Sequence, residues 1–171
     1  MADLSQYRLK YELVRLIELD KRIREEFCTK EPVTIDSKFL EEIGGCTIGR
    51  QSKTEDPDIV VTERDTSTSR RQGRLFSFAG GIYYEDNKDV IHPAAIRDNK
   101  GDCYVSTPGI QIDIFPGDVG INNRAYVALG EGPRLSLQEI VQWPEYLNTI
   151  PVKIGSVPRH VLKLMLEPKQ S

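Results

Sequence analysis

Short segments rich in Val, Ile, Tyr and Phe follow one another from residue 46 to residue 129, and turn-forming residues separate them. Branched and aromatic residues favour strands, whereas Pro, Gly, Asn and Asp favour the turns between them. Strands this short and closely spaced are typical of an antiparallel sandwich or barrel. The predicted strands cover residues 58–63, 74–79, 81–85, 94–97, 102–106, 109–115 and 124–129.

The N-terminal segment has a different pattern and predicts an amphipathic helix over residues 4–27. Leu9, Leu13 and Leu16 recur at spacings of four and three, which places them on one face of a helix. Asp3 has the position of an N-cap, and Gln6 completes a capping box three residues later. The apolar stripe of this helix, which includes Tyr7 and Tyr11, is wide enough to serve as a contact surface.

Two shorter helices are also predicted. Asp36 has the position of an N-cap, and the glycines at 44 and 45 would end the helix that it begins. Because the glycine-containing stretch 44–50 precedes no predicted helix, we interpret it as a helix end rather than a phosphate-binding loop. Ser136 opens a complete capping box near the C-terminus. Residues 157–166 fit either a helix or a strand.

These elements together predict an α+β fold. An N-terminal amphipathic helix and a short helix precede an antiparallel β-sandwich or partly open β-barrel, and a short capped helix lies near the C-terminus. The sequence divides into a helical segment, 1–44, and a β-rich part, 45–171. A chain of 171 residues is long enough to bury a substantial core, so we expect both parts to form one structural unit.

Composition excludes several classes of protein. The chain has 23 Lys and Arg against 26 Asp and Glu, and this net charge of −3 disfavours a protein that grips phosphate backbones over its whole surface. The sequence shows neither a signal peptide nor an apolar stretch of membrane-spanning length, so a cytoplasmic location without membrane contact is expected. Its three cysteines form no C-x-x-C motif, and we predict no metal and no cofactor.

Residue types capable of catalysis occur at two places. Cys103 and His92 lie on neighbouring predicted segments and are candidates for a nucleophile and its base. Asp56, Asp58 and Glu63 flank an apolar strand and are candidates for binding Mg²⁺ in a hydrolase or nuclease. A buried structural thiol and solvated turn carboxylates are the commoner roles of such residues, so we favour those roles.

The only basic concentration in the chain surrounds a Thr/Ser run. It consists of Arg64, Arg70, Arg71 and Arg74. Together with an exposed Tyr83 or Tyr84, these arginines could hold a single nucleic-acid strand by charge and stacking. Glu63 and Asp65 in the same loop weaken that interpretation and favour a solvated loop, although the net charge does not exclude a local contact with an anion.

The sequence therefore favours a non-enzymatic protein-binding or assembly module, a subunit of a homo-oligomer or of a larger complex. Its expected contact surfaces are the N-terminal helix, with Tyr7 and Tyr11, and the arginine loop from 64 to 74. Two alternatives stay open. One is a small metal-dependent hydrolase or nuclease that uses the clustered carboxylates, and the other is a β-barrel that binds single-stranded nucleic acid.

Overall fold

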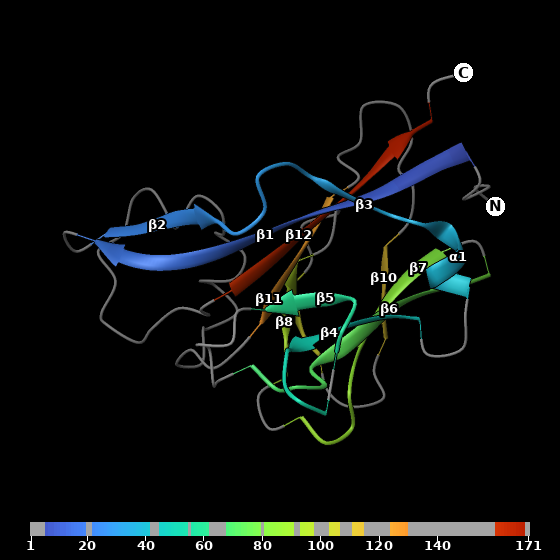
Figure 1. Cartoon of the computed structure of the whole chain (residues 1–171). Helices are drawn as coiled ribbons and strands as arrows, with labels where there is room; N and C mark the ends of the chain where they lie inside the picture. The colour runs from blue at the N-terminus through green and yellow to red at the C-terminus, as the bar shows by residue number, and fades with distance from the viewer. Residues whose placement is uncertain are drawn as a thin grey trace.

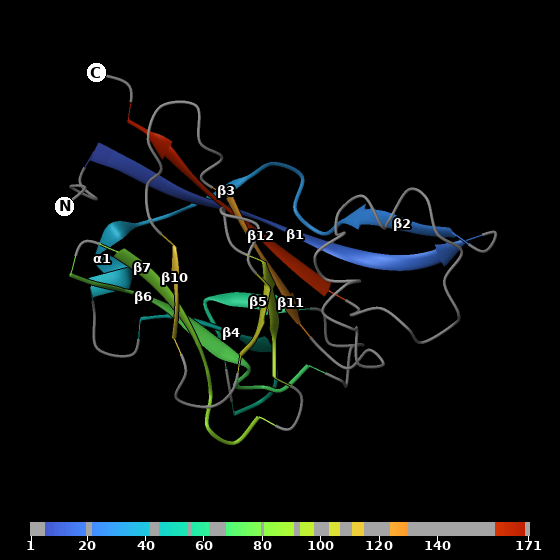
Figure 2. The same cartoon turned by 180° about the vertical axis from the view of Figure 1, so that it is seen from behind.

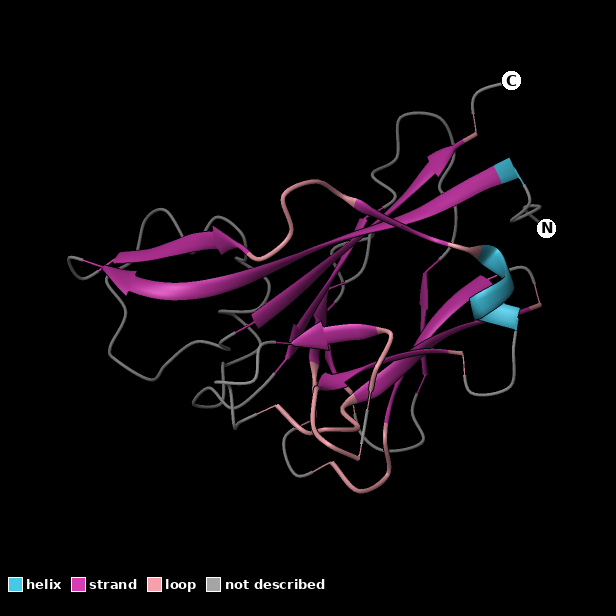
Figure 3. Cartoon of the chain, viewed as in Figure 1, coloured by secondary structure: helices cyan, strands magenta, loops and turns pink. Residues whose placement is uncertain are grey.

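Two β-sheets pack face to face in the computed structural model of the chain (Figure 1). The structure describes residues 6–19, 22–41, 45–54, 56–61, 68–79, 81–90, 93–97, 103–106, 111–114, 124–129 and 160–169. Within these ranges the single α-helix is α1 (Ser37–Glu41), and strands make up most of the rest (Figure 3). In the same part of the chain, no helix has the length and hydrophobicity to cross a bilayer.

The larger sheet has seven strands, all paired antiparallel, in the order β2-β1-β12-β11-β8-β9, with β3 also paired to β1. Its strands are β1 (Tyr7–Leu19), β2 (Arg22–Phe27), β3 (Val33–Ile35), β8 (Ala95–Arg97), β9 (Cys103–Val105), β11 (Arg124–Leu129) and β12 (His160–Pro168). The first strand and the last strand are therefore neighbours, which brings the two chain ends to one end of the sandwich (Figure 1).

The smaller sheet has five strands in the order β10-β7-β6-β4-β5. Its strands are β4 (Cys46–Arg50), β5 (Ile59–Val61), β6 (Gly73–Phe78), β7 (Gly81–Asp86) and β10 (Gln111–Ile114). All of its pairs are antiparallel except β4 with β5, which run parallel. The loops at one end of this sheet carry the basic residues described below.

The prediction of an N-terminal amphipathic helix is wrong, because Tyr7–Leu19 and Arg22–Phe27 form the paired antiparallel strands β1 and β2. From Tyr7 to Leu13 every second residue is apolar, so the segment also has the period of a strand. Leu9 and Leu13 are buried, whereas Arg8, which precedes Leu9 in the strand, is exposed. In residues 7–13 the apolar positions recur at every second residue, as in a strand, and therefore also at every fourth residue, as in a helix. The pairing of this segment with β12 selects the strand.

The partner strand explains that selection. In β12, Leu162, Leu164 and Leu166 alternate with polar or partly exposed residues, and all three are buried. They lie opposite Leu13, Tyr11 and Leu9 in the antiparallel register. The two alternating apolar rows cover the same face, so a sheet buries both together. This pairing also settles the open choice for the C-terminal segment, which is a strand from residue 160 to residue 168.

Beyond Arg15, β1 no longer contacts β12 and pairs with β2 alone. The far half of the hairpin consequently extends past the two packed sheets, as both views show (Figures 1 and 2). After β2 the chain turns back into β3, which pairs with residues 9–11 in the first half of β1.

The core lies between the two sheets. Leu13, Val127 and Leu164 enter it from the larger sheet, and Ile48 and Leu75 enter it from the smaller one. All five are at most 3% exposed, and each buried aliphatic side chain of this size stabilises the fold by roughly 1.5–3 kcal/mol. These side chains form one continuous cluster that joins the two sheets.

All seven strands predicted between residues 58 and 129 are present, with ends that differ by a few residues. The α+β class is nevertheless wrong, because two sheets dominate the described residues. Helix α1 spans five residues, and the side chain of Asp36 accepts a hydrogen bond from the Lys38 N–H at 3.0 Å before it. The predicted capped helix at Ser136 lies outside the described residues.

Candidate functional site

A basic hollow of about 710 Å³ lies at one end of the smaller sheet, between the segment after β4 and the segment before β6. Its described lining residues are Arg50, Gln51, Ser52, Lys53, Thr54 and Arg70. Three of these six are cations, two carry hydroxyl groups, and none is a carboxylate. Lys53 and Arg70 are exposed and Arg50 is half-buried, so the charges face solvent at the opening of the hollow.

Two hydrogen bonds from Arg50 to backbone carbonyls hold together the two segments that form the basic hollow. The Arg50 N–H donates to the Ser69 carbonyl at 3.1 Å, and the Arg50 Nε donates to the Thr68 carbonyl at 3.3 Å. Thr68 is fully buried. Because Arg50 makes both contacts, its guanidinium is positioned by the neighbouring loop rather than free to rotate.

Gln72 links this loop to the rest of the sheet and is itself fully buried. Its N–H donates to the Ile48 carbonyl at 3.0 Å, and its carbonyl accepts from the Asn87 N–H at 3.1 Å. Its side-chain Oε1 accepts from the Ser69 N–H at 2.9 Å. One buried residue thus connects β4, the loop before β6 and the turn after β7, and fixes all three relative to one another.

Gly49 allows the loop to approach β4 closely. A Cβ at this position would collide with the Arg70 carbonyl oxygen and would lie 3.1 Å from that of Ser69. Glycine within a strand often marks such a close approach of two backbones. The absence of a side chain at Gly49 is therefore what lets Arg70 lie beside Arg50.

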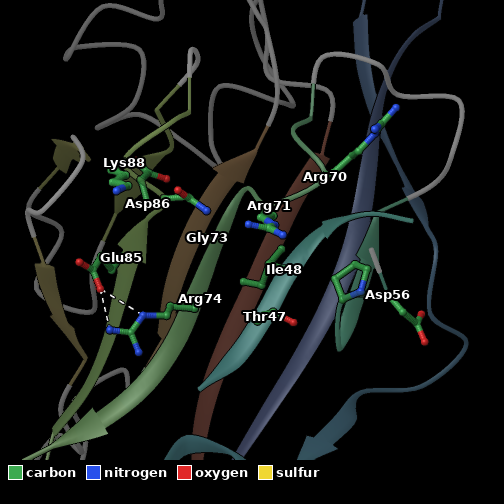
Figure 4. Close-up of a pocket in the computed structure, with 12 residues that line it drawn as sticks. Thr47, Ile48, Asp56, Arg70, Arg71, Gly73, Arg74, Glu85, Asp86 and Lys88 are labelled. Carbon is green, nitrogen blue, oxygen red and sulfur yellow. Dashed lines mark hydrogen bonds and ion pairs between the residues drawn. The ribbon is translucent and has the colours of Figure 1, made fainter. Parts of the chain in front are cut away.

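A second hollow, of about 460 Å³, adjoins the basic hollow at Arg70 and runs onto the outer face of the smaller sheet (Figure 4). Arg71 and Lys88 line its loop end. On the sheet, Arg74 and Glu85 face each other across β6 and β7 and form an ion pair, with Nη2 and Oε2 2.9 Å apart (Figure 4). The charges of this pair compensate each other, and the exposed cations Arg70, Arg71 and Lys88 lie at the loop end.

Asp86, at the end of β7, is almost fully buried beneath the second hollow. Its carboxylate accepts hydrogen bonds from the Tyr84 hydroxyl at 2.8 Å and from the Ala94 N–H at 3.1 Å. Burial raises the pKa of Asp86 above its ordinary value, although these hydrogen bonds act in the opposite direction. The carboxylate fastens the segment at Ala94 to β7 and so supports the turn that contains Asn87.

Three of the four predicted arginines lie at these two hollows. Arg70 and Arg71 are exposed at the loop end, while Arg74 lies on the sheet and is paired with Glu85. Arg64 lies outside the described residues. Of the two tyrosines predicted to accompany them, Tyr83 is half-buried on the outer face and Tyr84 is completely buried in the core.

Arg50 and Lys53 are absent from the site predicted from sequence, because the pattern of residues 44–50 also fits the end of a helix. Residues 46–50 instead form β4, which carries Arg50 to the edge of the basic hollow. A usable signal was present in Gly49, since a glycine inside an apolar strand indicates a close backbone contact at that point.

The carboxylates proposed for metal binding have structural partners. Asp58 Oδ2 accepts hydrogen bonds from the Thr47 N–H at 3.0 Å and the Thr47 hydroxyl at 3.1 Å, which joins β4 to the start of β5. Asp56 accepts from the Gln51 side chain at 3.3 Å. Across the described ranges, no three His, Cys, Asp or Glu side chains form a group that could hold a metal ion. Glu63 lies outside those ranges.

The proposed nucleophile and base are not described together. His92 lies outside the described residues, and Cys103 is placed only by its backbone, in strand β9. Tyr7 and Tyr11 are strand residues of β1 that pack against the core, so the apolar stripe attributed to a helix belongs partly to the sandwich interior.

The two cysteines with described side chains differ in exposure, and this predicts their reactivity. Cys28 is exposed, whereas burial and the neighbouring Asp58 raise the pKa of Cys46 to about 12. Since the thiolate is the reactive form, iodoacetamide at pH 8 should modify Cys28 well before Cys46. Peptide mass spectrometry over time measures both, with urea-unfolded protein as the control. Equal rates in the folded protein would contradict the burial of Cys46.

The fold resembles a known structure. No family model and no curated protein sequence matches this chain. Its structure is similar to the crystal structure of full-length yeast Pml1p, with a TM-score of 0.50 and 13% sequence identity over 98% of this chain and 87% of that one. At this identity the likeness shows the arrangement of the strands alone.

Proposed function

We propose that this chain is a protein-binding module that captures a phosphorylated side chain of a protein partner in the basic hollow. The observation that carries this proposal is the grouping of Arg50, Lys53 and Arg70 around one opening whose described lining contains no carboxylate. Arginine forks and hydroxyl donors are the groups that proteins use to bind phosphate. Such a module would recruit its partner rather than transform it chemically.

Phosphate suits this donor set better than a carboxylate does. A phosphorylated side chain carries a charge of about −1.5 to −2 and three acceptor oxygens, whereas a carboxylate carries one charge and two oxygens. Three cations and the hydroxyls of Ser52 and Thr54 surround the hollow. The fixed position of Arg50 also lowers the entropy lost when a ligand orders its guanidinium.

The direct test is binding of a fluorescein-labelled peptide pool with one fixed phosphothreonine in otherwise randomised sequence. We expect phosphate-dependent binding that weakens with salt, and a loss of about 10- to 100-fold in Arg70→Ala, because each charge-assisted hydrogen bond is worth about 1.5–3 kcal/mol. Arg50→Lys should also weaken binding, since it keeps the charge but removes the fork.

Arg8→Ala is the matched control, because it removes an exposed arginine from β1 in the other sheet. Its affinity should stay within about twofold of the unaltered protein, as expected for a distant screened charge. Equal binding of the phosphothreonine and threonine pools would refute the proposal. A pool with aspartate at the fixed position should bind more weakly than the phosphorylated pool.

A further inference from the structure

The outer face of the smaller sheet carries three adjoining aromatic rings, which we call the aromatic ladder: Phe76, Phe78 and Tyr83. Phe76 and Tyr83 are cross-strand partners, and their rings stack with centroids 5.4 Å apart and planes inclined by 15°. Phe78 meets Tyr83 edge-on at 6.2 Å. Phe78 is 67% exposed, which is unusual for a large apolar side chain.

The aromatic ladder continues the second hollow along β6 and β7. The Arg74 guanidinium lies over the Phe76 ring, with its Cζ 4.3 Å from the centroid, and the same side chain lines the hollow. Figure 4 shows Arg74 and Glu85 on the strands and Arg71 nearer the loops. From Arg70 to Phe78 one surface therefore changes from cationic to compensated to aromatic.

The length of this surface sets the size of its ligand. Phe78 is seven residues beyond Arg71, and β6 provides most of that distance. A strand advances by about 3.3 Å per residue, and because Arg71 and Gln72 precede the strand, the two ends are separated by at most about 23 Å. An extended peptide has almost the same rise, and about six to eight of its residues would reach from the loop end of the second hollow, where the basic hollow adjoins it, to the aromatic ladder.

The charge distribution favours a peptide over a nucleic acid. Asp56 and Glu85 also line the second hollow, one on each side of it (Figure 4). A nucleic-acid strand has a phosphate at every nucleotide and would bring several of them past these carboxylates. A peptide with one phosphorylated side chain places its charge at the cationic end only.

We infer that the aromatic ladder is a second anchor point for the partner, and that it takes a bulky apolar residue six to eight positions from the phosphorylated one. This inference rests on the proposed function of the basic hollow. The apolar side chain would pack against Phe78 and Tyr83, while the intervening residues cross the second hollow in extended form. Requiring both anchors makes the module select among phosphorylated segments.

Synthetic peptides test the inference directly. Each carries one phosphothreonine in a Gly/Ser-rich sequence, with a tryptophan seven positions away, with a tryptophan three positions away, or with no tryptophan. We expect the seven-residue spacing to bind about tenfold more tightly than the other two, a typical gain for burying one aromatic contact. Phe78→Ala should abolish this advantage, and Phe78→Trp should keep it.

Phe27→Ala is the matched control, because Phe27 is a 55% exposed phenylalanine in the other sheet. It should leave the advantage intact, and its unfolding midpoint should match that of Phe78→Ala. An advantage that is absent, or that survives Phe78→Ala, overturns the second anchor while phosphate-dependent binding still stands. If no phosphopeptide binds, the basic hollow fails and the second anchor fails with it. Tighter, Phe78-dependent binding of a single-stranded oligonucleotide would also overturn it.

Discussion

Asp86→Ala is expected to destabilise the fold by about 2–4 kcal/mol, because it leaves two buried donors without an acceptor, each costing about 1–3 kcal/mol. These donors are the Tyr84 hydroxyl and the Ala94 N–H, and both Asp86 and Tyr84 are at most 1% exposed. For a chain of this length the unfolding midpoint should fall by roughly 5–15 °C. Urea denaturation followed by circular dichroism measures the change in unfolding free energy, and thermal denaturation measures the change in midpoint temperature.

Asp86→Asn separates lost hydrogen bonds from lost charge. The amide oxygen can accept from the Ala94 N–H, and the amide NH₂ can donate to the Tyr84 oxygen, so this variant should lose less stability than Asp86→Ala. If the two variants are equally unstable, the hydrogen bonds are not what Asp86 contributes.

The stability of the unaltered protein should depend on pH differently from that of Asp86→Asn, and the sign of the difference follows from the pKa of Asp86. Burial raises the pKa of Asp86 above 3.8, so the folded state holds its proton more tightly than the unfolded state does. The stability that this tighter proton binding provides is present below the pKa of Asp86 in the unfolded chain, and it is lost as the pH rises through the pKa of Asp86 in the folded protein. The unaltered protein should therefore lose stability relative to Asp86→Asn over that interval. A gain with rising pH would contradict the burial of this carboxylate.

Gly49→Ala should have the second large effect, on stability and on phosphopeptide binding together. The added methyl group collides with the Arg70 carbonyl, and to relieve that contact the loop must move away from β4. The movement would break the hydrogen bond from the Arg50 N–H to Ser69 and displace Arg70 from the basic hollow. We expect a loss of about 1–3 kcal/mol, as for other overpacked sites, and binding reduced at least tenfold.

Val60→Ala is the control for this variant. Val60 is the register partner of Gly49 in β5, and it is 38% exposed, so its truncation changes the same strand pair without filling the loop contact. Its stability and affinity should stay near those of the unaltered protein. Unchanged phosphopeptide binding in Gly49→Ala would show that the close approach of the loop does not position the arginines.

Local sequence patterns were sufficient to predict an element where only one kind of secondary structure fits the pattern. The strand 81–86 alternates buried Ile82 and Tyr84 with half-buried Tyr83 and Glu85, and turn residues close it at both ends. The arginine loop was also visible, because it is the only basic concentration in the chain. Arg50 was not visible as a member of that site, since 18 or more residues separate it from Thr68 to Arg70 and only the pairing of β4 with β6 brings them together.

The sequence by itself determined the strand-rich middle of the chain, the absence of a general cationic character and the place of the arginine loop. These are local properties, set by side-chain type and by turn residues. The tertiary structure decided the conformation of β1, because the apolar positions of residues 7–13 satisfy both a helix and a strand, and only burial beside Leu162, Leu164 and Leu166 distinguishes the two. It also decided the composition of the basic hollow, since backbone contact at Gly49 joins loops that are distant in sequence.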